Sequence, residues 1–190
     1  MINNEVMRVI MTRNSYKMFD GKPIGNEELD TIIQAGLHAP TGMNGQPWHF
    51  TVIKSPEMLA RVGKIRRSLP LPPHLANLPA PPPGVPAPGS TDPMRNAPVL
   101  ILVSGRESHP TNHEDCVLAM ENMFLAAWSL GIGSGWDHAM VRDFFNTEGG
   151  KAIKPELIPE GFAIRAAAFF GYPVPMDKDK GPRKGTVAYL

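Results

Sequence analysis

Hydrophobic residues recur with helical spacing in three stretches of the chain, and each stretch predicts a helix. The first covers residues 4–11, and either of the two asparagines at its start can cap it. The second covers 26–37, with Asn26 as the expected N-cap. The third covers 114–130, where apolar side chains occupy most of the circumference and Gly131 is a natural stop. We therefore expect the third helix to be buried from several directions.

Other stretches have the pattern of strands. Residues 49–54 alternate between apolar and polar, whereas 99–103 is a continuous apolar run, as expected of a strand covered on both faces. The last strand candidate is 162–170, and a short helix is expected at 56–65. The sequence therefore predicts three strands, of which the one at 99–103 is covered on both faces.

Proline changes the pattern between residues 70 and 96. Repeated prolines exclude a continuous helix or a central strand there, so we expect an irregular loop or lid inserted into a single domain that spans 1–190. A different hypothesis treats 79–88 as a ligand for a proline-binding groove, which would make the chain an interaction protein.

Composition restricts the class of protein. The 190 residues are 19% charged with a formal net charge of +1, and no long run of lysine and arginine occurs, which argues against a nucleic-acid partner. No apolar run is long enough to span a bilayer, and the first residues lack the order of a signal peptide. The single cysteine, Cys116, allows no internal disulfide, in agreement with a reducing compartment. We therefore expect a cytoplasmic protein without a membrane partner.

Two segments have the residue types of a ligand site. Residues 39–48 combine two prolines and two glycines with Asn44 and Gln46, whose amides both donate and accept hydrogen bonds, as recognition of a flat heterocycle requires. Residues 13–17 alternate two cations with a hydroxyl, a pattern that suits a phosphate group. Together they predict a phosphorylated cofactor that carries a ring.

A glycine cluster at 131–135 is a weaker candidate. It resembles part of a dinucleotide fingerprint, but it follows a helix instead of a strand, and Trp136 stands where the third glycine should fall. Two interpretations of this cluster remain equally open. It forms a helix C-cap followed by a glycine-rich turn, or it contacts a cofactor.

A metal site is not expected. His109 and His113 lie close to Asp115 and Cys116, but a structural zinc site draws its ligands from two separated clusters. Capping of the following helix by Asn112 or His113 is the favoured interpretation of this segment, and Cys116 is expected to be a small buried hydrophobe instead of a nucleophile.

Taken jointly, these segments resemble the FMN-dependent nitroreductase family over nearly the whole chain. Members open with a basic-x-Ser-x-basic segment and continue with a helix that ends in Ala-Pro-Ser/Thr-x-x-Asn-x-Gln-Pro-Trp before a strand. The chain has RNSYK at 13–17 and APTGMNGQPW at 39–48, followed by the strand candidate. The glycine cluster, the Gly-Tyr-Pro at 171–173 and the basic pair at 183–184 also match the family in order and spacing.

The resemblance implies an α+β fold with a mainly antiparallel central sheet flanked by helices, built as an intertwined homodimer with FMN at the subunit interface. Family positions assign the phosphate and the ribityl chain to the N-terminal segment and the basic tail, and the isoalloxazine ring to the proline-glycine loop and the glycine cluster. The residues implied are Arg13, Asn14, Ser15, Lys17, Pro40, Thr41, Met43, Asn44, Gln46, Ser134, Gly135, Arg183 and Lys184. His138 and Ala139 depart from the acidic-Gly pair of some members, and no family position matches the proline-rich loop.

The same resemblance implies an oxidoreductase that passes electrons from NAD(P)H through FMN to a small flat acceptor of the nitroaromatic or quinone type, in a ping-pong cycle. Such a reaction needs no protein acid, base or nucleophile at a fixed position, so no catalytic side chain is expected. A flavin-binding sensor or storage protein without turnover is the alternative.

Overall fold

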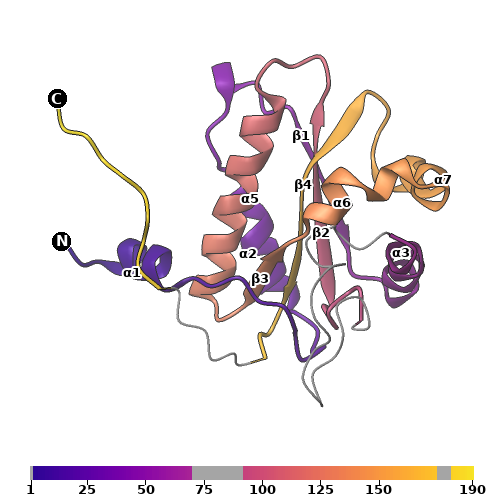
Figure 1. The fold of residues 1–190 in the computed structure, drawn as a ribbon, viewed down its shortest axis with the longest axis horizontal. Helices are drawn as coiled ribbons and strands as arrows, with labels where there is room; N and C mark the ends of the chain where they lie inside the picture. The colour runs from indigo at the N-terminus through magenta and orange to yellow at the C-terminus, as the bar shows by residue number, and fades with distance from the viewer. Residues whose placement is uncertain (1, 70–91, 175–180) are drawn as a thin grey trace.

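A four-stranded antiparallel sheet forms the centre of the protein (Figure 1). The structure is a computed structural model that describes residues 2–69, 92–174 and 181–190. The sheet order is β1-β2-β4-β3, and the bounds of the strands are β1 Trp48–Ile53, β2 Val99–Arg106, β3 Gly133–Trp136 and β4 Phe162–Gly171. The predicted α+β class with an antiparallel sheet is therefore confirmed.

The central strand β2 is buried on both faces, which explains the continuous apolar run at 99–103. Its residues from Val99 to Gly105 are all buried, and it pairs with β1 on one side and with β4 on the other. Side chains of a strand alternate between faces, so the run supplies two separate cores. Val99 and Ile101 enter the core on one face, whereas Leu100 and Leu102 enter the core on the other.

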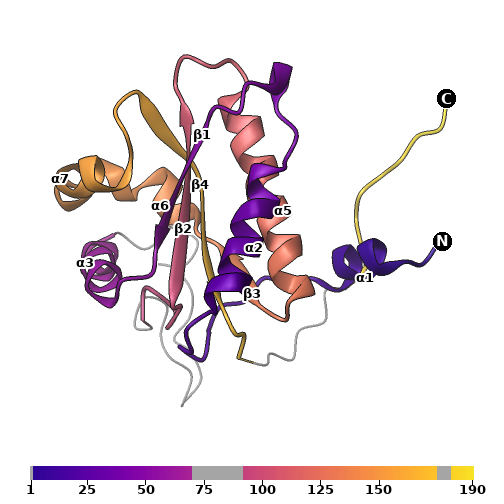
Figure 2. The same ribbon diagram turned by 180° about the vertical axis from the view of Figure 1, so that it is seen from behind.

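Helices cover both faces of the sheet (Figures 1 and 2). The core on one face is completed by α2 (Asn26–Leu37) and α5 (Asn112–Ser129). The other core is completed by α3 (Pro56–Arg67), α6 (His138–Arg142), a short 3₁₀ turn at Phe144–Asn146 and α7 (Glu148–Leu157). Among the described residues, no helix has both the length and the apolar character needed to cross a membrane.

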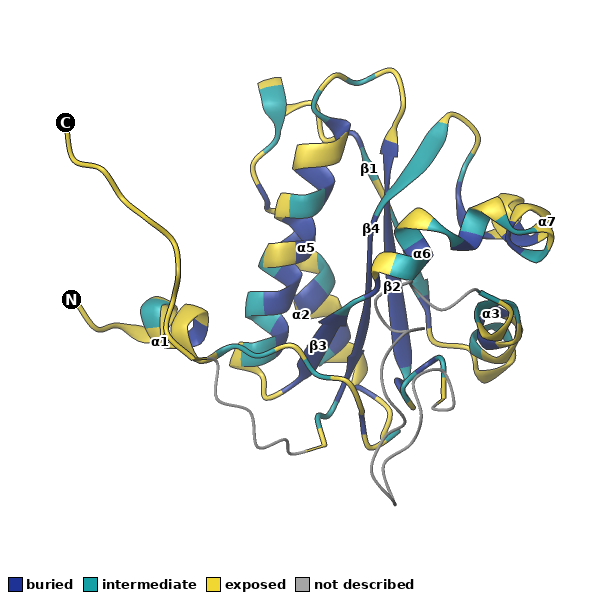
Figure 3. Cartoon of the chain, viewed as in Figure 1, coloured by how far each residue is buried: buried dark blue, intermediate teal, exposed yellow. Residues whose placement is uncertain are grey.

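The first helix, α1 (Glu5–Thr12), lies at the side of this body (Figure 3). Asn4 caps it, since its side chain accepts a hydrogen bond from the Met7 amide at 2.9 Å. Only Val9 is buried, whereas Val6 and Ile10 on the same predicted face are exposed. Residues 181–190 are also exposed and extend to the same side of the body as α1.

Several local predictions need correction. Gly25, not Asn26, is the N-cap of α2, because the Glu28 carboxylate accepts from the Gly25 amide at 2.9 Å and so satisfies the end of the helix. The strand β3 and the helices α6 and α7 were not predicted. Residues 70–91 of the predicted proline-rich loop lie outside the described residues, and so does the proposed proline ligand at 79–88.

Candidate functional site

The N-terminal segment 13–17 and the glycine cluster meet at the edge of the sheet. Ser15 and Ser134 form an isolated parallel bridge, and the Tyr16 amide donates to the Ser134 carbonyl at 2.9 Å. The segment thus lies along β3 on the side that β4 leaves open. We call residues 13–17 together with 133–135 the β3-edge site. Two segments that the sequence singled out separately are therefore adjacent.

Two glycines of β3, which have no Cβ atom, permit the close approach of residues 13–17 to this strand. A Cβ atom on Gly135 would lie 2.5 Å from the Tyr16 carbonyl oxygen and 3.0 Å from Nη1 of Arg95. A Cβ atom on Gly133 would lie 2.9 Å from both Pro173 and the ring of Tyr16. Real Cβ atoms do not approach other atoms so closely, so the glycines are required by the packing of the edge.

In the β3-edge site the polar and cationic side chains of residues 13–17 are at least partly exposed, whereas Ser134 is buried. Ser15 and Lys17 are exposed, and the Arg13 side chain retains 25% of its exposure. The Arg13 guanidinium lies 3.7 Å from the Glu121 carboxylate and 5.6 Å from the centre of the Phe124 ring. A long ion pair of this kind holds the guanidinium near the site without saturating its five donors. The donor set fits a phosphate group.

A buried charge cluster lies beside this site. Arg66 donates to both carboxylate oxygens of Asp137, at 2.8 and 3.1 Å, and also to the Pro93 carbonyl. Arg95 is the second cation, and its guanidinium and that of Arg66 lie 4.9 and 5.2 Å from the centre of the Phe169 ring. Burial lowers the pKa of the Arg95 guanidinium. Two arginines and one carboxylate give the cluster a formal charge of +1.

Nothing in the sequence pattern joins the members of this cluster, because they come from three separate segments. Arg66 lies in the last turn of α3, Arg95 lies near the end of the proline-rich stretch in a left-handed conformation, and Asp137 follows β3. The sequence analysis therefore missed them as neighbours of the site.

The other predicted segment, the 41–46 loop, lies at the opposite end of α5. The Gly42 amide donates to the Asp115 carboxylate at 3.1 Å, in the first turns of α5. Met43, Asn44 and Gln46 have positive φ angles of 54°, 53° and 43°, and all three side chains are exposed. The loop thus presents its polar and apolar side chains outward from an unusual backbone.

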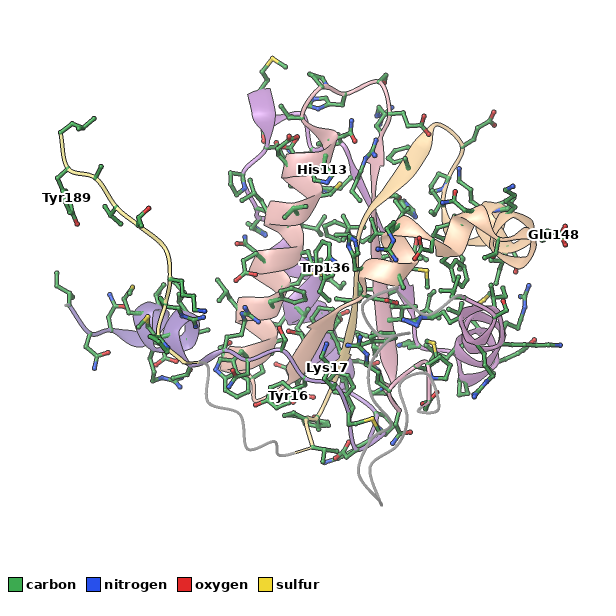
Figure 4. All side chains as sticks on the ribbon, viewed as in Figure 1. Tyr16, Lys17, His113, Trp136, Glu148 and Tyr189 are labelled. Atoms are coloured by element: carbon green, nitrogen blue, oxygen red, sulfur yellow. The ribbon has the colours of Figure 1, made fainter. Side chains whose placement is uncertain are left out.

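The helix α5 separates the two halves of the predicted site (Figure 4). The β3-edge site adjoins its C-terminal end, where the Trp128 indole donates to the Thr12 hydroxyl at 2.8 Å and stacks at 5.9 Å on Tyr16. Asp115 and Trp128 are thirteen residue steps apart along the helix, about 20 Å at 1.5 Å per residue. Within one chain the structure does not bring the two halves together.

The remaining predicted residues show varied outcomes. Arg183 and Lys184 are exposed in the tail. Thr111 is the N-cap of α5, so the expected capping by Asn112 or His113 is wrong; the Asn112 amide oxygen instead accepts from Arg165 at 2.6 Å. Burial raises the pKa of the Cys116 thiol to about 12, in line with its expected role as a buried hydrophobe.

Comparison with known proteins identifies the family. The model of the nitroreductase family matches residues 10–148. The chain belongs to the nitroreductase family. It is 30% identical over 173 residues to a protein of Archaeoglobus fulgidus that is named provisionally as an NADH dehydrogenase/NAD(P)H nitroreductase, with 89% of this chain and 86% of that protein covered.

Solved structures agree with this result. A nitroreductase with bound FMN from Bacteroides fragilis superposes with a TM-score of 0.82 and 28% identity over 99% of this chain and 100% of that chain. A nitroreductase with bound FMN from Desulfitobacterium hafniense shares the fold, with a TM-score of 0.79 and 24% identity over the whole of both chains. The predicted family and its oxidoreductase class are confirmed, and the predicted cofactor is the one named in these neighbours.

Proposed function

We propose that this nitroreductase passes electrons from NAD(P)H through bound FMN to a small flat acceptor of the nitroaromatic or quinone type, in a ping-pong cycle. The observation that supports it most directly is the β3-edge site, where the segment that carries Arg13, Ser15 and Lys17 lies along a strand edge next to a buried cluster of net positive charge. A doubly charged phosphate on a flat, polar ring system matches this arrangement.

The proposal places each FMN between two copies of the chain. The ring would have to touch both the 41–46 loop and Ser134 with Gly135, which lie at opposite ends of α5 in one chain. A twofold axis that sets two α5 helices antiparallel brings the loop of one copy beside the β3-edge site of the other. The geometry of the single chain therefore supports a dimer with two shared sites.

Exposed apolar side chains support the same dimer. They lie on and beside α1, at Leu118 on the outer face of α5, at Leu130 directly after this helix and in the C-terminal tail. The residues concerned are Ile2, Val6, Ile10, Met11, Leu118, Leu130, Val187 and Tyr189. Large exposed apolar surfaces of this kind typically bind another protein chain. We propose that α1 and the tail embrace the second copy, and that the tail carries Arg183 or Lys184 to the phosphate.

The chain's own residues bind and orient in this proposal. Arg13, Ser15 and Lys17, with the Asn14 backbone between them, hold the phosphate and the ribityl chain, while Ser134 and Gly135 offer backbone polar groups to the ring. Pro40, Thr41, Met43, Asn44 and Gln46 of the other copy line the opposite side. FMN held by these residues would supply the redox chemistry, which is hydride acceptance from NAD(P)H and electron donation to the acceptor. No side chain is assigned a proton transfer.

The first test is the cofactor itself. We expect the protein to purify yellow, with FMN released on denaturation, because the charged donors of the β3-edge site suit that phosphate. Anaerobic titration with NADH and then NADPH is expected to bleach the flavin, and an added quinone is expected to restore it. A colourless protein that takes up no added FMN contradicts the proposal, whereas bleaching without reoxidation by any acceptor favours the sensor or storage function.

Dimer formation is tested on the outer face of α5. Met123 of α5 is fully buried against α2, since a Cβ atom on Gly36 would lie 2.9 Å from its Cγ, so it cannot face a second copy. Leu118 is 45% exposed on the same helix and is the better position. We expect Leu118→Asp to shift the protein to monomers and to release FMN, because burial of an unpaired carboxylate in an interface costs free energy.

Analytical ultracentrifugation with absorbance at the flavin wavelength measures both effects together. Thr31→Asp, an exposed position on α2 outside this face, is the matched control and is expected to remain a yellow dimer. A Leu118→Asp monomer that retains FMN would show that the site is complete within one chain.

We also propose a cytoplasmic location, which the lone buried Cys116 supports.

A further inference from the structure

The backbone of the 41–46 loop is held in a conformation that it would not adopt alone. Three residues without the freedom of glycine, Met43, Asn44 and Gln46, have positive φ angles, and their side chains are exposed. Each such residue costs free energy, and a run of them persists only where surrounding contacts determine the path of the chain.

Asp115 supplies a contact from outside the loop. Its carboxylate is 3% exposed, accepts from the Gly42 amide at 3.1 Å and accepts from the Thr111 hydroxyl at 2.8 Å. Thr111 in turn lies against the loop, since a Cβ atom on Gly42 would be 2.5 Å from its hydroxyl oxygen. The acid therefore fixes both the first residue of the turn and the side chain on which that turn rests.

His109 completes the support. Its Nδ1 lies 3.2 Å from the Thr111 hydroxyl and 3.9 Å from the Asp115 carboxylate, and its Nε2 occupies the space that a side chain on Gly45 would need. The three residues form a chain from imidazole through hydroxyl to carboxylate along one side of the loop. We call them the loop anchor.

We propose that Asp115, with Thr111 and His109, is a positioning residue for the flavin ring bound at the other subunit's β3-edge site. This inference rests on the proposed function. Asp115 itself is too deep to touch a ligand, and it acts through the Gly42 amide by holding Met43 and Asn44 in their outward arrangement. Removal of the anchor lets the strained turn relax, so the loop is no longer held in the conformation that contacts the ring.

The test compares Asp115→Ala with Asp115→Asn. We expect Asp115→Ala to raise the dissociation constant of FMN about tenfold, because the Gly42 amide loses its partner and the turn relaxes. Asp115→Asn retains an oxygen that accepts from this amide, so it is expected to restore most of the affinity. Thr147→Ala removes a comparable hydrogen bond, to the Gly150 amide on α7, and is the control expected to change FMN affinity less than about twofold.

Hydrogen exchange on flavin-free protein separates this inference from the proposed function. In Asp115→Ala the amides of residues 42–46 are expected to exchange faster, whereas those of α2 and the body of α5 keep their protection. If Asp115→Ala does not fold, Thr111→Val replaces it in this test. The same amides are then expected to exchange faster, but by a smaller factor. Unchanged loop exchange and unchanged FMN affinity in a folded variant would overturn the inference; a wild-type protein that binds no FMN would overturn the proposed function instead.

Mixed dimers locate the effect. Asp115→Ala chains with one affinity tag are combined with Arg13→Ala chains that carry another, and the doubly tagged dimers are isolated. If the anchor serves the partner's site, one site carries both defects and the other is intact, so half of the FMN binds with wild-type affinity. If it serves its own chain, each site carries one defect and no tight site remains. The second outcome overturns the assignment to the partner.

Discussion

Asp137→Asn is expected to lower the free energy of unfolding by about 3–5 kcal/mol. The substitution preserves the shape of the side chain but removes the only negative charge of the cluster formed with Arg66 and Arg95. Both members of the ion pair are almost fully buried, so water cannot replace the lost carboxylate. For a domain of this size we expect the melting temperature to fall by roughly 6–20 °C. Thermal unfolding followed by circular dichroism measures the change.

Glu156→Gln is the matched control. Glu156 also receives two hydrogen bonds from one arginine, Arg61, at 2.7 and 2.8 Å, but both side chains are about half exposed. Solvent replaces an exposed partner at little cost, so the melting temperature is expected to stay within about 1 °C of the wild type. Equal losses in the two variants would show that burial of the cluster contributes nothing to its energetics.

Arg13→Ala is expected to weaken FMN binding roughly 10- to 150-fold, against about 2- to 12-fold for Asn44→Ala. The first variant removes a charge-assisted contact from a dianionic phosphate, whereas the second removes a neutral hydrogen bond. The Arg13 guanidinium is poised for the contact by the Glu121 carboxylate at 3.7 Å and by the Phe124 ring. Quenching of flavin fluorescence on titration into flavin-free protein gives both dissociation constants.

Riboflavin, which lacks the phosphate, is the control ligand for this pair. The affinity for riboflavin is expected to respond to Asn44→Ala and to be nearly indifferent to Arg13→Ala. Equal losses of FMN affinity in the two variants, or a large loss of riboflavin affinity in Arg13→Ala, would place the phosphate elsewhere.

Elements with a strong local pattern were predictable from the sequence. The apolar run of β2 and the long helix α5 appear where expected, because in each the spacing of apolar residues matches the period of the element. The strand β3 was missed, since its sequence Gly-Ser-Gly-Trp has the composition of a turn. Its extended form depends on pairing with β4 and on the approach of Tyr16, and neither contact is local in sequence.

The candidate site was predictable as a set of segments but not as an arrangement. Motif spacing selected residues 13–17 and 39–48, yet their separation depends on the direction of α5, which a local pattern does not encode. The roles of Asp115 and Asp137 were hidden for the same reason. Each is a buried acid whose partners come from distant parts of the chain, so the purpose of its burial is evident only in three dimensions.

The position of the two half-sites at opposite ends of α5 also has a thermodynamic consequence for the proposed dimer. A ligand that contacts both copies binds the associated state in preference to the free chains, so it must tighten association by the same factor by which association tightens its own binding. The fraction of chains that are both paired and loaded with FMN then rises with either the FMN concentration or the protein concentration. Dilution would lower the apparent affinity for FMN, and scarcity of FMN would lower the fraction of paired chains.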